Sequence, residues 1–494
     1  MLEEARERWP GRASFILAAV GSAVGLGNAW RFPYVCYANG GGAFLIPYFI
    51  GLFVLGIPWL AMELGMGHMM QKGAPQTFAS MGKKWEWAGW WQVLMAFMLV
   101  IYYVVIMSWC LGYMVHSATL SWGSDATGFF HDFIGKTGGV EVTGALQWPI
   151  LIGLLICWVA IFFILHRGVR RVGKVVWFTV LLPWALLVIL VIRGLTLDGA
   201  LDGLNWYLEP NLAALLKPNV WVAAFGQIAF SLSVGQGVMI AYASYLPKKS
   251  DVTNNCVITS LADAATAFFA GFAVFSILGF MIFQNPGLEI GELSESSIGL
   301  AFTTYPTAIS QMPTGGQIIG IIFFLCLWTL GIDSAFSLAE SFITAITDKW
   351  EISKDRATAL VCSFAFLAGA IFTTGAGIYW LDIVDHAVGF YGLLLCGLTM
   401  CLVVGWVFGA DKLRCHLNEA SDIKLGKWFN WFIKVVTPLA IMIPLVPALI
   451  NNIRTPYNGH PQWALLIGLW GALVGTLVLA FVLAHIKEKE EAAK

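Results

Sequence analysis

The chain has 494 residues, of which 59% are hydrophobic and 12% are charged, and its formal net charge is −1. Soluble proteins carry about 25% charged residues, so a water-soluble core cannot hide this much apolar sequence and a lipid bilayer is the expected solvent. The near-neutral charge argues against nucleic acid as a partner. No cysteine lies in the polar stretch 118–147 and no Asn-x-Ser/Thr sequon occurs, so no extracellular disulfide framework is predicted.

Apolar windows of about 20 residues predict an all-α integral membrane protein with roughly twelve transmembrane helices, because only helices satisfy their backbone polar groups in lipid. The expected spans are 13–37, 41–69, 88–117, 148–166, 173–193, 219–246, 255–283, 316–347, 357–373, 379–408, 428–450 and 463–485. Residues 1–12 are expected to form a cytoplasmic N-terminal segment, and residues 486–494 a cytoplasmic tail.

The distribution of lysine and arginine predicts the orientation. With the N-terminus inside, twenty-two basic residues fall in cytoplasmic segments, among them Lys349, and only Lys136, Arg193, Lys217 and Arg454 lie outside. This bias follows the positive-inside rule and predicts two cytoplasmic termini. A multi-pass protein of a prokaryotic inner (plasma) membrane fits these features best.

Two spans contain small polar runs that interrupt the apolar sequence. The first carries GSAVGLGN at 21–28, and the sixth carries SLSVGQG at 231–237. Glycine and serine weaken a helix at these depths. Matched breaks predict an inverted repeat of helices 1–5 (13–193) and 6–10 (219–408), two additional helices (428–485), and a binding site at the membrane midplane. The alternative is close helix packing through small residues.

Ionisable residues inside the predicted spans are candidates for function, because each costs roughly 2.5–3.5 kcal/mol at a helix centre. They are Arg31, Glu63, Asp263, Asp333, Glu340, Asp382 and Asp385. Bound cations would compensate the two central aspartates, Asp263 and Asp333, since carboxylates are hard-cation ligands. Protonation, or pairing with a helix terminus, is the alternative. Glu63 is expected to bridge broken backbone segments.

Catalytic signatures are missing from the sequence. It contains no HExxH, no P-loop, no G-x-S-x-G elbow and no kinase motif. We therefore expect neither an enzyme nor an ATP-driven pump, and no organic cofactor. An ion gradient is the expected energy source.

Five ordered motifs resemble the neurotransmitter:sodium symporter family. They are GSAVGLGNAWRFP at 21–33, NGGGAFLIP at 39–47, GQIAFSLS at 226–233, LGIDS at 330–334 and FGADK at 408–412. The resemblance implies a sodium-coupled secondary active symporter of amino acids that works by alternating access. It also implies the five-plus-five inverted fold with broken helices 1 and 6.

The resemblance implies a substrate site and two sodium sites. The substrate site would use Ala23, Leu26, Gly27, Leu99, Tyr103, Phe230, Ser231, Ser233, Gln236, Ser334 and Leu338. A first sodium ion would use Ala23, Asn28, Ser231 and Asp263, where the family usually has asparagine at the last position. A second sodium ion would use Gly21, Val24, Leu330, Asp333 and Ser334.

Further family features concern substrate choice and gating. Monoamine transporters have aspartate where this chain has Gly25, so the resemblance implies a substrate that brings its own carboxylate, a zwitterionic amino acid. Gln236 stands where the family often has an apolar residue, so a polar or small substrate side chain is expected. Arg31 with Asp385 would form an outer gate through water, with Tyr103 over Phe230 beneath it. Arg6 with Asp348, near Trp9 and Tyr245, would close the inner side.

The resemblance also bears on chloride. Animal members have a serine, and many bacterial members a glutamate, where this chain has Ala267, whereas Tyr48, Gln227 and Ser231 match other chloride-site positions. Asp263 lies one helical turn before Ala267 on the same helix face and would replace the anion. The expectation is a chloride-independent symporter with two sodium ions. A sodium channel and a non-transporting amino acid sensor remain alternatives, and the oligomeric state is not predicted.

Overall fold

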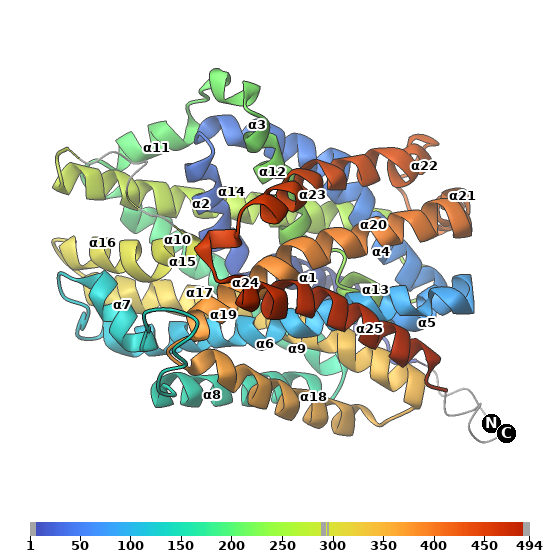
Figure 1. The fold of residues 1–494 in the computed structure, drawn as a ribbon. Coiled ribbons are helices and arrows are strands. Elements are labelled where there is room, and N and C mark those ends of the chain that lie inside the picture. Colours follow the sequence, from blue (N-terminus) through green and yellow to red (C-terminus); the bar gives the residue numbers. More distant parts are fainter. Residues whose placement is uncertain (1–5, 288–292, 294–295, 488–494) are drawn as a thin grey trace.

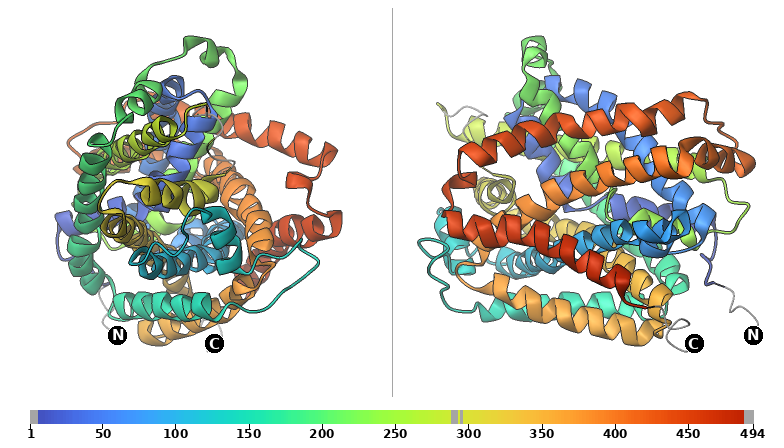
Figure 2. Two further views of the ribbon diagram at one scale, coloured as in Figure 1. Left: turned by 90° about the vertical axis from the view of Figure 1, so that its left-hand side faces the viewer. Right: turned by 45° about the vertical axis from the view of Figure 1, so that its right-hand side comes forward.

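The computed structural model describes residues 6–287, 293 and 296–487, and all regular elements in these residues are helices. The helices run roughly alongside one another as a bundle (Figure 1 and Figure 2). Ten helices in the described part are long and apolar enough to cross a membrane, and one bent pair raises the number to eleven. The all-α membrane class is confirmed. Residues 1–5 and 488–494 of the expected cytoplasmic segments lie outside the described residues.

The first five spans follow the predicted order, with short π-helical segments (η) inside several of them. The first comprises α1 (Arg12–Ala23), η1 (Gly27–Arg31) and α2 (Phe32–Ala38), and the second comprises α3 (Gly42–Gly51), η2 (Leu52–Gly56) and α4 (Ile57–Met70). The third is α6 (Glu86–Ser117), the fourth is α8 (Trp148–Leu165), and the fifth joins α9 (Val169–Thr179) to α10 (Leu181–Leu195).

The sixth to twelfth spans complete the bundle. The sixth comprises α12 (Pro218–Ser231) and α13 (Val238–Ser244), the seventh is α14 (Val252–Gln284), the eighth is α17 (Gly316–Trp350), and the ninth is α18 (Lys354–Gly369). The tenth comprises α19 (Gly377–Asp385), η8 (His386–Gly392), α20 (Leu393–Leu402), η9 (Val403–Gly409) and α21 (Ala410–Ala420). The eleventh comprises α22 (Trp428–Trp431), η10 (Phe432–Val436) and α23 (Thr437–Arg454), and the twelfth comprises α24 (Gln462–Leu465), η12 (Leu466–Gly471) and α25 (Ala472–His485).

Both spans predicted to be interrupted are broken. The axes of α1 and the η1–α2 segment differ by 49° across the break at 24–26. Between α12 and α13, residues 232–237 leave the helical conformation, so neither half alone is long enough to count as a span. This second break accounts for the difference between the eleven helices found by length and the twelve predicted by hydropathy.

Several boundaries differ from the predicted ones. The tenth span continues as α21 to Ala420 rather than ending at 408, because its polar residues lie on an amphipathic helix beyond the apolar region. Short helices also occupy connections that hydropathy could not reveal. They are α5 (Ala74–Met81), α7 (Ala126–Ile134), α11 (Ala200–Leu208), α15 (Ser297–Gly299), the π-helical η6 (Leu300–Thr304), α16 (Tyr305–Gln311) and the 3₁₀ helices η3 (Lys83–Trp85), η4 (Leu212–Leu216) and η11 (Tyr457–Gly459). A further 3₁₀ helix, η7 (Ala370–Thr373), ends the ninth span.

Two long helices, α6 and α17, pack along each other through the middle of the bundle (Figure 1). Phe97 stacks on Phe342 with ring centroids 4.5 Å apart, and Trp90 lies 5.4 Å from Trp350. Aromatic pairs of this kind add about 0.5–1.5 kcal/mol each beyond the area they bury. The pair forms a rigid support behind the two broken spans.

The burial of Lys349 corrects one assumption of the count of basic residues, which treats this lysine as part of an exposed cytoplasmic segment. The count places it in a cytoplasmic loop, but α17 extends past 347, and Lys349 is 2% exposed. Its Nζ lies 2.6 Å from Glu86 Oε1 and donates to the carbonyl of Leu483 at 2.7 Å. A buried lysine is tolerated because it is paired and hydrogen-bonded. The hydrogen bond to Leu483 also places the end of α25 beside the C-terminal end of α17, which carries the Arg6–Asp348 pair.

Candidate functional site

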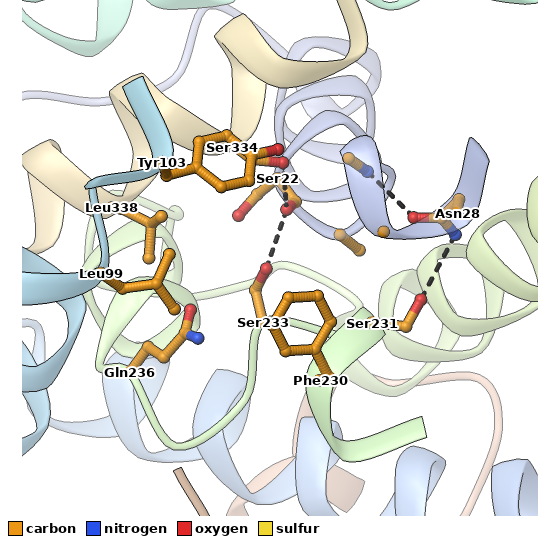
Figure 3. A pocket seen from close by; sticks show the side chains of 13 residues that line it. Ser22, Asn28, Leu99, Tyr103, Phe230, Ser231, Ser233, Gln236, Ser334 and Leu338 are labelled. Carbon is orange, nitrogen blue, oxygen red and sulfur yellow. Dashed lines mark hydrogen bonds between the residues drawn. The ribbon is translucent and has the colours of Figure 1, made fainter. Parts of the chain in front are cut away.

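A cavity lies where the two broken spans meet the α6–α17 support (Figure 3). It is lined by Ser22, Ala23, Gly25, Gly27, Asn28, Leu99, Tyr103, Phe230, Ser231, Ser233, Gln236, Ser334 and Leu338. These include all of the predicted substrate residues except Leu26. The space open to water-molecule centres is about 30 Å³, and one water needs about 10–15 Å³ on this measure. An organic ligand therefore requires side chains to move apart.

The break in the first span depends on glycines that leave no room for side chains. A Cβ on Gly25 would lie 2.5 Å from the Ser334 hydroxyl oxygen and 3.0 Å from the Tyr103 hydroxyl oxygen. A Cβ on Gly27 would lie 2.9 Å from the Phe230 ring. The polypeptide backbone itself thus forms this wall of the cavity. The backbone groups at this helix end are held by side chains, since the N–H of Gly25 donates to Asn28 Oδ1 at 3.0 Å; a helix end of this kind favours a charged ligand.

The break in the sixth span uses left-handed backbone conformations. Ser233, Gly235 and Gly237 have φ values of 51°, 77° and 69°. The backbone N–H of Gly235 donates to the carboxylate of Glu63, which therefore contacts the break in the sixth span; that it bridges both breaks stays a prediction. Residues with positive φ interrupt the helical hydrogen-bond pattern and free main-chain groups.

One backbone oxygen joins both breaks to the support. The carbonyl oxygen of Ser22 accepts a hydrogen bond from the Ser233 hydroxyl at 2.8 Å and another from the Ser334 hydroxyl at 3.2 Å. The Ser22 hydroxyl lies 2.8 Å from that of Ser337. Sequence reasoning missed Ser22, because which carbonyl a helix break frees depends on local backbone geometry.

The side chains predicted for the first sodium ion lie together. The Asn28 amide donates to Asp263 Oδ1 at 2.7 Å, and the Ser231 hydroxyl lies 2.8 Å from Asp263 Oδ2 and 2.9 Å from Oδ1. Asp263 is completely buried. Asn28 and Ser231 also line the cavity, as does Ala23. This arrangement places the buried Asp263 carboxylate directly behind one amide and one hydroxyl of the cavity wall, a donor set suited to a hard cation.

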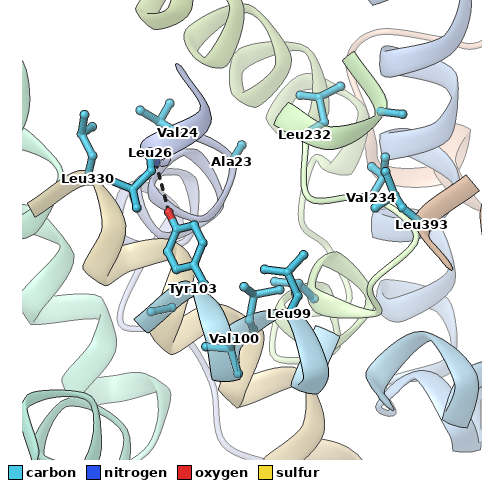
Figure 4. Close-up of a cluster of buried hydrophobic side chains, with 14 of the residues drawn as sticks. Ala23, Val24, Leu26, Leu99, Val100, Tyr103, Leu232, Val234, Leu330 and Leu393 are labelled. Atoms are coloured by element: carbon cyan, nitrogen blue, oxygen red, sulfur yellow. Dashed lines mark hydrogen bonds between the residues drawn. The ribbon is translucent and has the colours of Figure 1, made fainter. Parts of the chain in front are cut away.

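Of the residues predicted for the second sodium ion, Gly21 lies beside the side chain of Asp333. Its Oδ1 accepts from the Thr179 hydroxyl at 2.6 Å, and a Cβ on Gly21 would lie 3.1 Å from both its Cβ and its Cγ. Val24 and Leu330 lie in one apolar cluster beside the cavity (Figure 4). Sequence reasoning missed Thr179. A threonine in an apolar helix gives no signal of its own, and only packing shows that it faces Asp333.

Tyr103, which lines the cavity, contacts the backbone amide of Leu26, as the dashed line in Figure 4 shows. The backbone N–H of Leu26 donates to the Tyr103 hydroxyl at 3.1 Å, which leaves the hydroxyl proton available for an acceptor. Leu26 itself is fully buried and does not line the cavity. Gln236, 4% exposed, reaches the opposite wall beside Leu99 and Leu338, as Figure 3 shows.

The predicted inner gate is closed by direct contacts. Arg6 Nη1 lies 2.9 Å from Asp348 Oδ1, and Arg6 Nη2 donates to the Ser244 hydroxyl at 2.7 Å. The guanidinium lies over the Tyr245 ring, 4.7 Å from its centroid. Trp9 donates to the carbonyl of Tyr242 at 2.9 Å. These contacts hold the N-terminal segment against the C-terminal end of α17.

The outer gate implied by the resemblance is a water-mediated pair of Arg31 and Asp385, and it stays a prediction. Arg31 makes no ion pair with Asp385 within the described residues; its guanidinium lies over the Phe230 ring, 4.0 Å from the centroid. Asp385 instead accepts from the Tyr102 hydroxyl at 2.7 Å. This cation–π contact holds the Arg31 guanidinium against Phe230, a residue that lines the cavity. In the described part of the chain, the residues predicted for the inner gate are thus in direct contact, whereas Arg31 and Asp385 form no direct ion pair.

Comparison with known proteins gives a family and several relatives. The sequence matches the model of the Sodium:neurotransmitter symporter family over residues 6–133 and 123–490. It is 42% identical over 492 residues to an uncharacterized sodium-dependent transporter of Methanocaldococcus jannaschii, covering 99% of each chain. It is 33% identical to the Homo sapiens sodium- and chloride-dependent taurine transporter, covering 97% of this chain and 84% of the relative. The Homo sapiens sodium- and chloride-dependent creatine transporter 1 is also 33% identical, covering 96% and 82%.

Proposed function

Because the chain belongs to the sodium:neurotransmitter symporter family, and is thus a membrane transporter rather than an enzyme, we propose that it imports zwitterionic amino acids by sodium-coupled symport. It works by alternating access, with two sodium ions per cycle and without chloride. Its substrate site is the cavity lined by both helix breaks, and its sodium sites are the clusters around Asp263 and Asp333.

The observation that carries the substrate class is the crowding at Gly25. This chain has glycine at position 25, and a Cβ there would lie 2.5 Å from the Ser334 hydroxyl oxygen and 3.0 Å from that of Tyr103, so the present packing leaves no room for an acidic side chain. The anionic group must come with the substrate, where the Tyr103 hydroxyl and the broken helix end favour it. A monoamine lacks that group and would leave the site without a counter-charge.

Gln236 supports a substrate whose far end is polar. Its Oε1 is buried and has no hydrogen-bond partner among the described residues. A wholly aliphatic substrate would leave this amide oxygen unsatisfied, which costs about 1–3 kcal/mol. Taurine and creatine, for which two of the relatives are named, are small zwitterions and are compatible with this site.

The charge balance supports two sodium ions and no chloride. Two sodium ions, a neutral zwitterion and the carboxylates of Asp263 and Asp333 sum to zero. A buried site favours such balance because an uncompensated charge is costly. The named relatives depend on chloride, and the buried Tyr48 hydroxyl and Gln227 amide have no partner in the described part of the chain. In our proposal Asp263 supplies the negative charge that chloride supplies in those relatives.

The proposed membrane arrangement follows the charge bias. Both termini lie in the cytoplasm of a prokaryotic cell, and the inner gate faces that side. Residues 13–193 and 219–408 form the two inverted repeats, and 428–485 form the additional helix pair. The archaeal relative supports a prokaryotic setting.

Uptake into proteoliposomes tests the proposal. Each common amino acid is supplied with an inward gradient of sodium, potassium or choline, and dopamine and serotonin serve as matched monoamines. We expect uptake of at least one amino acid with sodium only, and none of the monoamines. Equal uptake in choline would refute the coupling, and tight monoamine transport would refute the substrate class. Sodium current without substrate would indicate the channel, and binding without uptake would indicate the sensor.

A further inference from the structure

A second cavity lies at the inner end of the bundle, between the start of α6 and the end of α25. Its volume is about 380 Å³, within the range of about 300–1,000 Å³ typical of small-molecule sites. Both cavities are lined in part by α6 and α17, but no residue lines both, because the substrate cavity uses Leu99, Tyr103, Ser334 and Leu338 and the second cavity uses the start of α6 and the end of α17. Its lining includes Lys84, Trp87, Phe481, His485 and Lys487.

The charge of this cavity is positive. Lys84 and Lys487 are exposed and make no ion pair in the part of the chain that the structure describes. The one acidic lining residue, Glu86, is 1% exposed and already neutralised by Lys349 at 2.6 Å. A ligand entering the cavity therefore meets two exposed ammonium groups and, among the described residues that line it, no free carboxylate.

An apolar surface leads directly into the cavity. Along α25, Val474, Val478 and Val482 are 57%, 55% and 51% exposed, as expected for a face that touches lipid tails. At its end Phe481 stacks on Trp87, with centroids 4.7 Å apart. Tryptophan rings concentrate at the depth of lipid headgroups. The ammonium groups of Lys84 and Lys487 thus lie next to the end of the lipid-facing surface.

We propose that this cavity binds the phosphate-bearing headgroup of an anionic phospholipid from the leaflet at the inner end of the bundle. The acyl chains lie along the exposed face of α25, and the phosphate lies between Lys84 and Lys487. Basic pockets between helices on the cytoplasmic side are suited to such headgroups. The bound lipid would hold the last helix against α6.

Native mass spectrometry of the full-length protein tests this site by titration with phosphatidylglycerol or phosphatidylcholine. We expect phosphatidylglycerol to bind more tightly than phosphatidylcholine. The double variant Lys84→Gln with Lys487→Gln should weaken the binding of phosphatidylglycerol about 25-fold, because each lysine contributes about fivefold to the affinity. Lys248→Gln with Lys249→Gln is the matched control, because these exposed lysines lie at the same end of the bundle. Equal affinity of both double variants, or of both lipids, would overturn the proposal.

Two further arms identify the source of the ligand. Inorganic phosphate and glycerol 1-phosphate are added at the lipid concentration; displacement of phosphatidylglycerol by either would show a site for free phosphate instead. The sequence also continues with Glu488, Glu490 and Glu491. Changing all three to glutamine should leave lipid binding in place. If the parent bound none and this variant did, the chain's own tail would be the occupant and the lipid proposal would be wrong.

Discussion

Replacing Asp263 by asparagine removes one negative charge from the buried cluster while keeping the shape of the side chain. In the parent, Asp263 accepts from Asn28 at 2.7 Å and from Ser231 at 2.8 Å. The amide oxygen of an asparagine retains the first contact. Its NH2 group makes the second by donating to the Ser231 hydroxyl. The variant is therefore expected to fold, and its effect reports on charge.

The expected magnitude follows from Coulomb's law. A unit charge about 4 Å from a sodium ion contributes about 4 kcal/mol at an effective dielectric constant of 20, which is roughly 10³-fold in sodium affinity. A chloride ion about 5 Å away restores about 3 kcal/mol of this on the same scale. The Tyr48 and Gln227 side chains, unpartnered among the described residues, are the groups expected to hold it.

The assay is sodium-dependent uptake in proteoliposomes with chloride or gluconate as the anion. We expect the parent to be indifferent to the anion. Asp263→Asn should need roughly 10²- to 10³-fold more sodium in gluconate and recover most of this loss in chloride. Adding Ala267→Ser, one turn later, should strengthen the chloride response. Strong chloride dependence of the parent, or an Asp263→Asn variant with parental sodium affinity in gluconate, would falsify the reasoning.

Three further predictions use other residues. Asp333→Ala and Asp333→Asn should both abolish coupled uptake and sodium-dependent thermal stabilisation. Asparagine can keep the Thr179 contact, so its effect would report the loss of charge. If either variant kept the sodium dependence of the parent, Asp333 would have only a structural role. Tyr103→Phe removes the hydroxyl that is hydrogen-bonded to the Leu26 amide and should weaken substrate binding about 10- to 100-fold, as measured by scintillation proximity. An unchanged substrate affinity would exclude Tyr103 from the substrate site. Asp251 caps α14; burial would raise its pKa, but hydrogen bonds from two backbone amides hold the pKa below its usual range. The contribution of Asp251 to the free energy of unfolding is therefore present above the pKa of the unfolded state, near 4, and is lost as the pH falls through the pKa of the folded state. Asp251→Ala should lower the melting temperature at pH 7 by the equivalent of about 1 kcal/mol, and by less at pH 3.

The helix breaks were predictable from sequence because their cause is local. Glycine and serine runs at 21–28 and 231–237 weaken helices wherever they occur. The gathering of Asn28, Ser231 and Asp263 from three spans was available only from the family resemblance. Nothing in their spacing along the chain brings these three side chains together.

Other parts of the site depend on packing that sequence does not reveal. Thr179 also hydrogen-bonds its own helix at Val175, so its residue type alone gives no hint of Asp333. The contact of the Arg31 guanidinium with the Phe230 ring is another detail of packing that the spacing of these residues along the chain does not reveal. A charge count likewise cannot tell an exposed loop lysine from Lys349, which is buried because α17 runs farther than its apolar stretch.

The shared acceptor at Ser22 has a consequence for how this protein can be probed. Its carbonyl oxygen is held by Ser233 and Ser334, so a movement that separates the first span from either partner must give up a hydrogen bond. Alanine scanning at position 22 leaves that oxygen untouched. Exchanging the amide between residues 22 and 23 for an ester makes the carbonyl a weaker acceptor. Backbone chemistry, rather than side-chain mutagenesis, would therefore reveal how firmly this junction resists the transport motion.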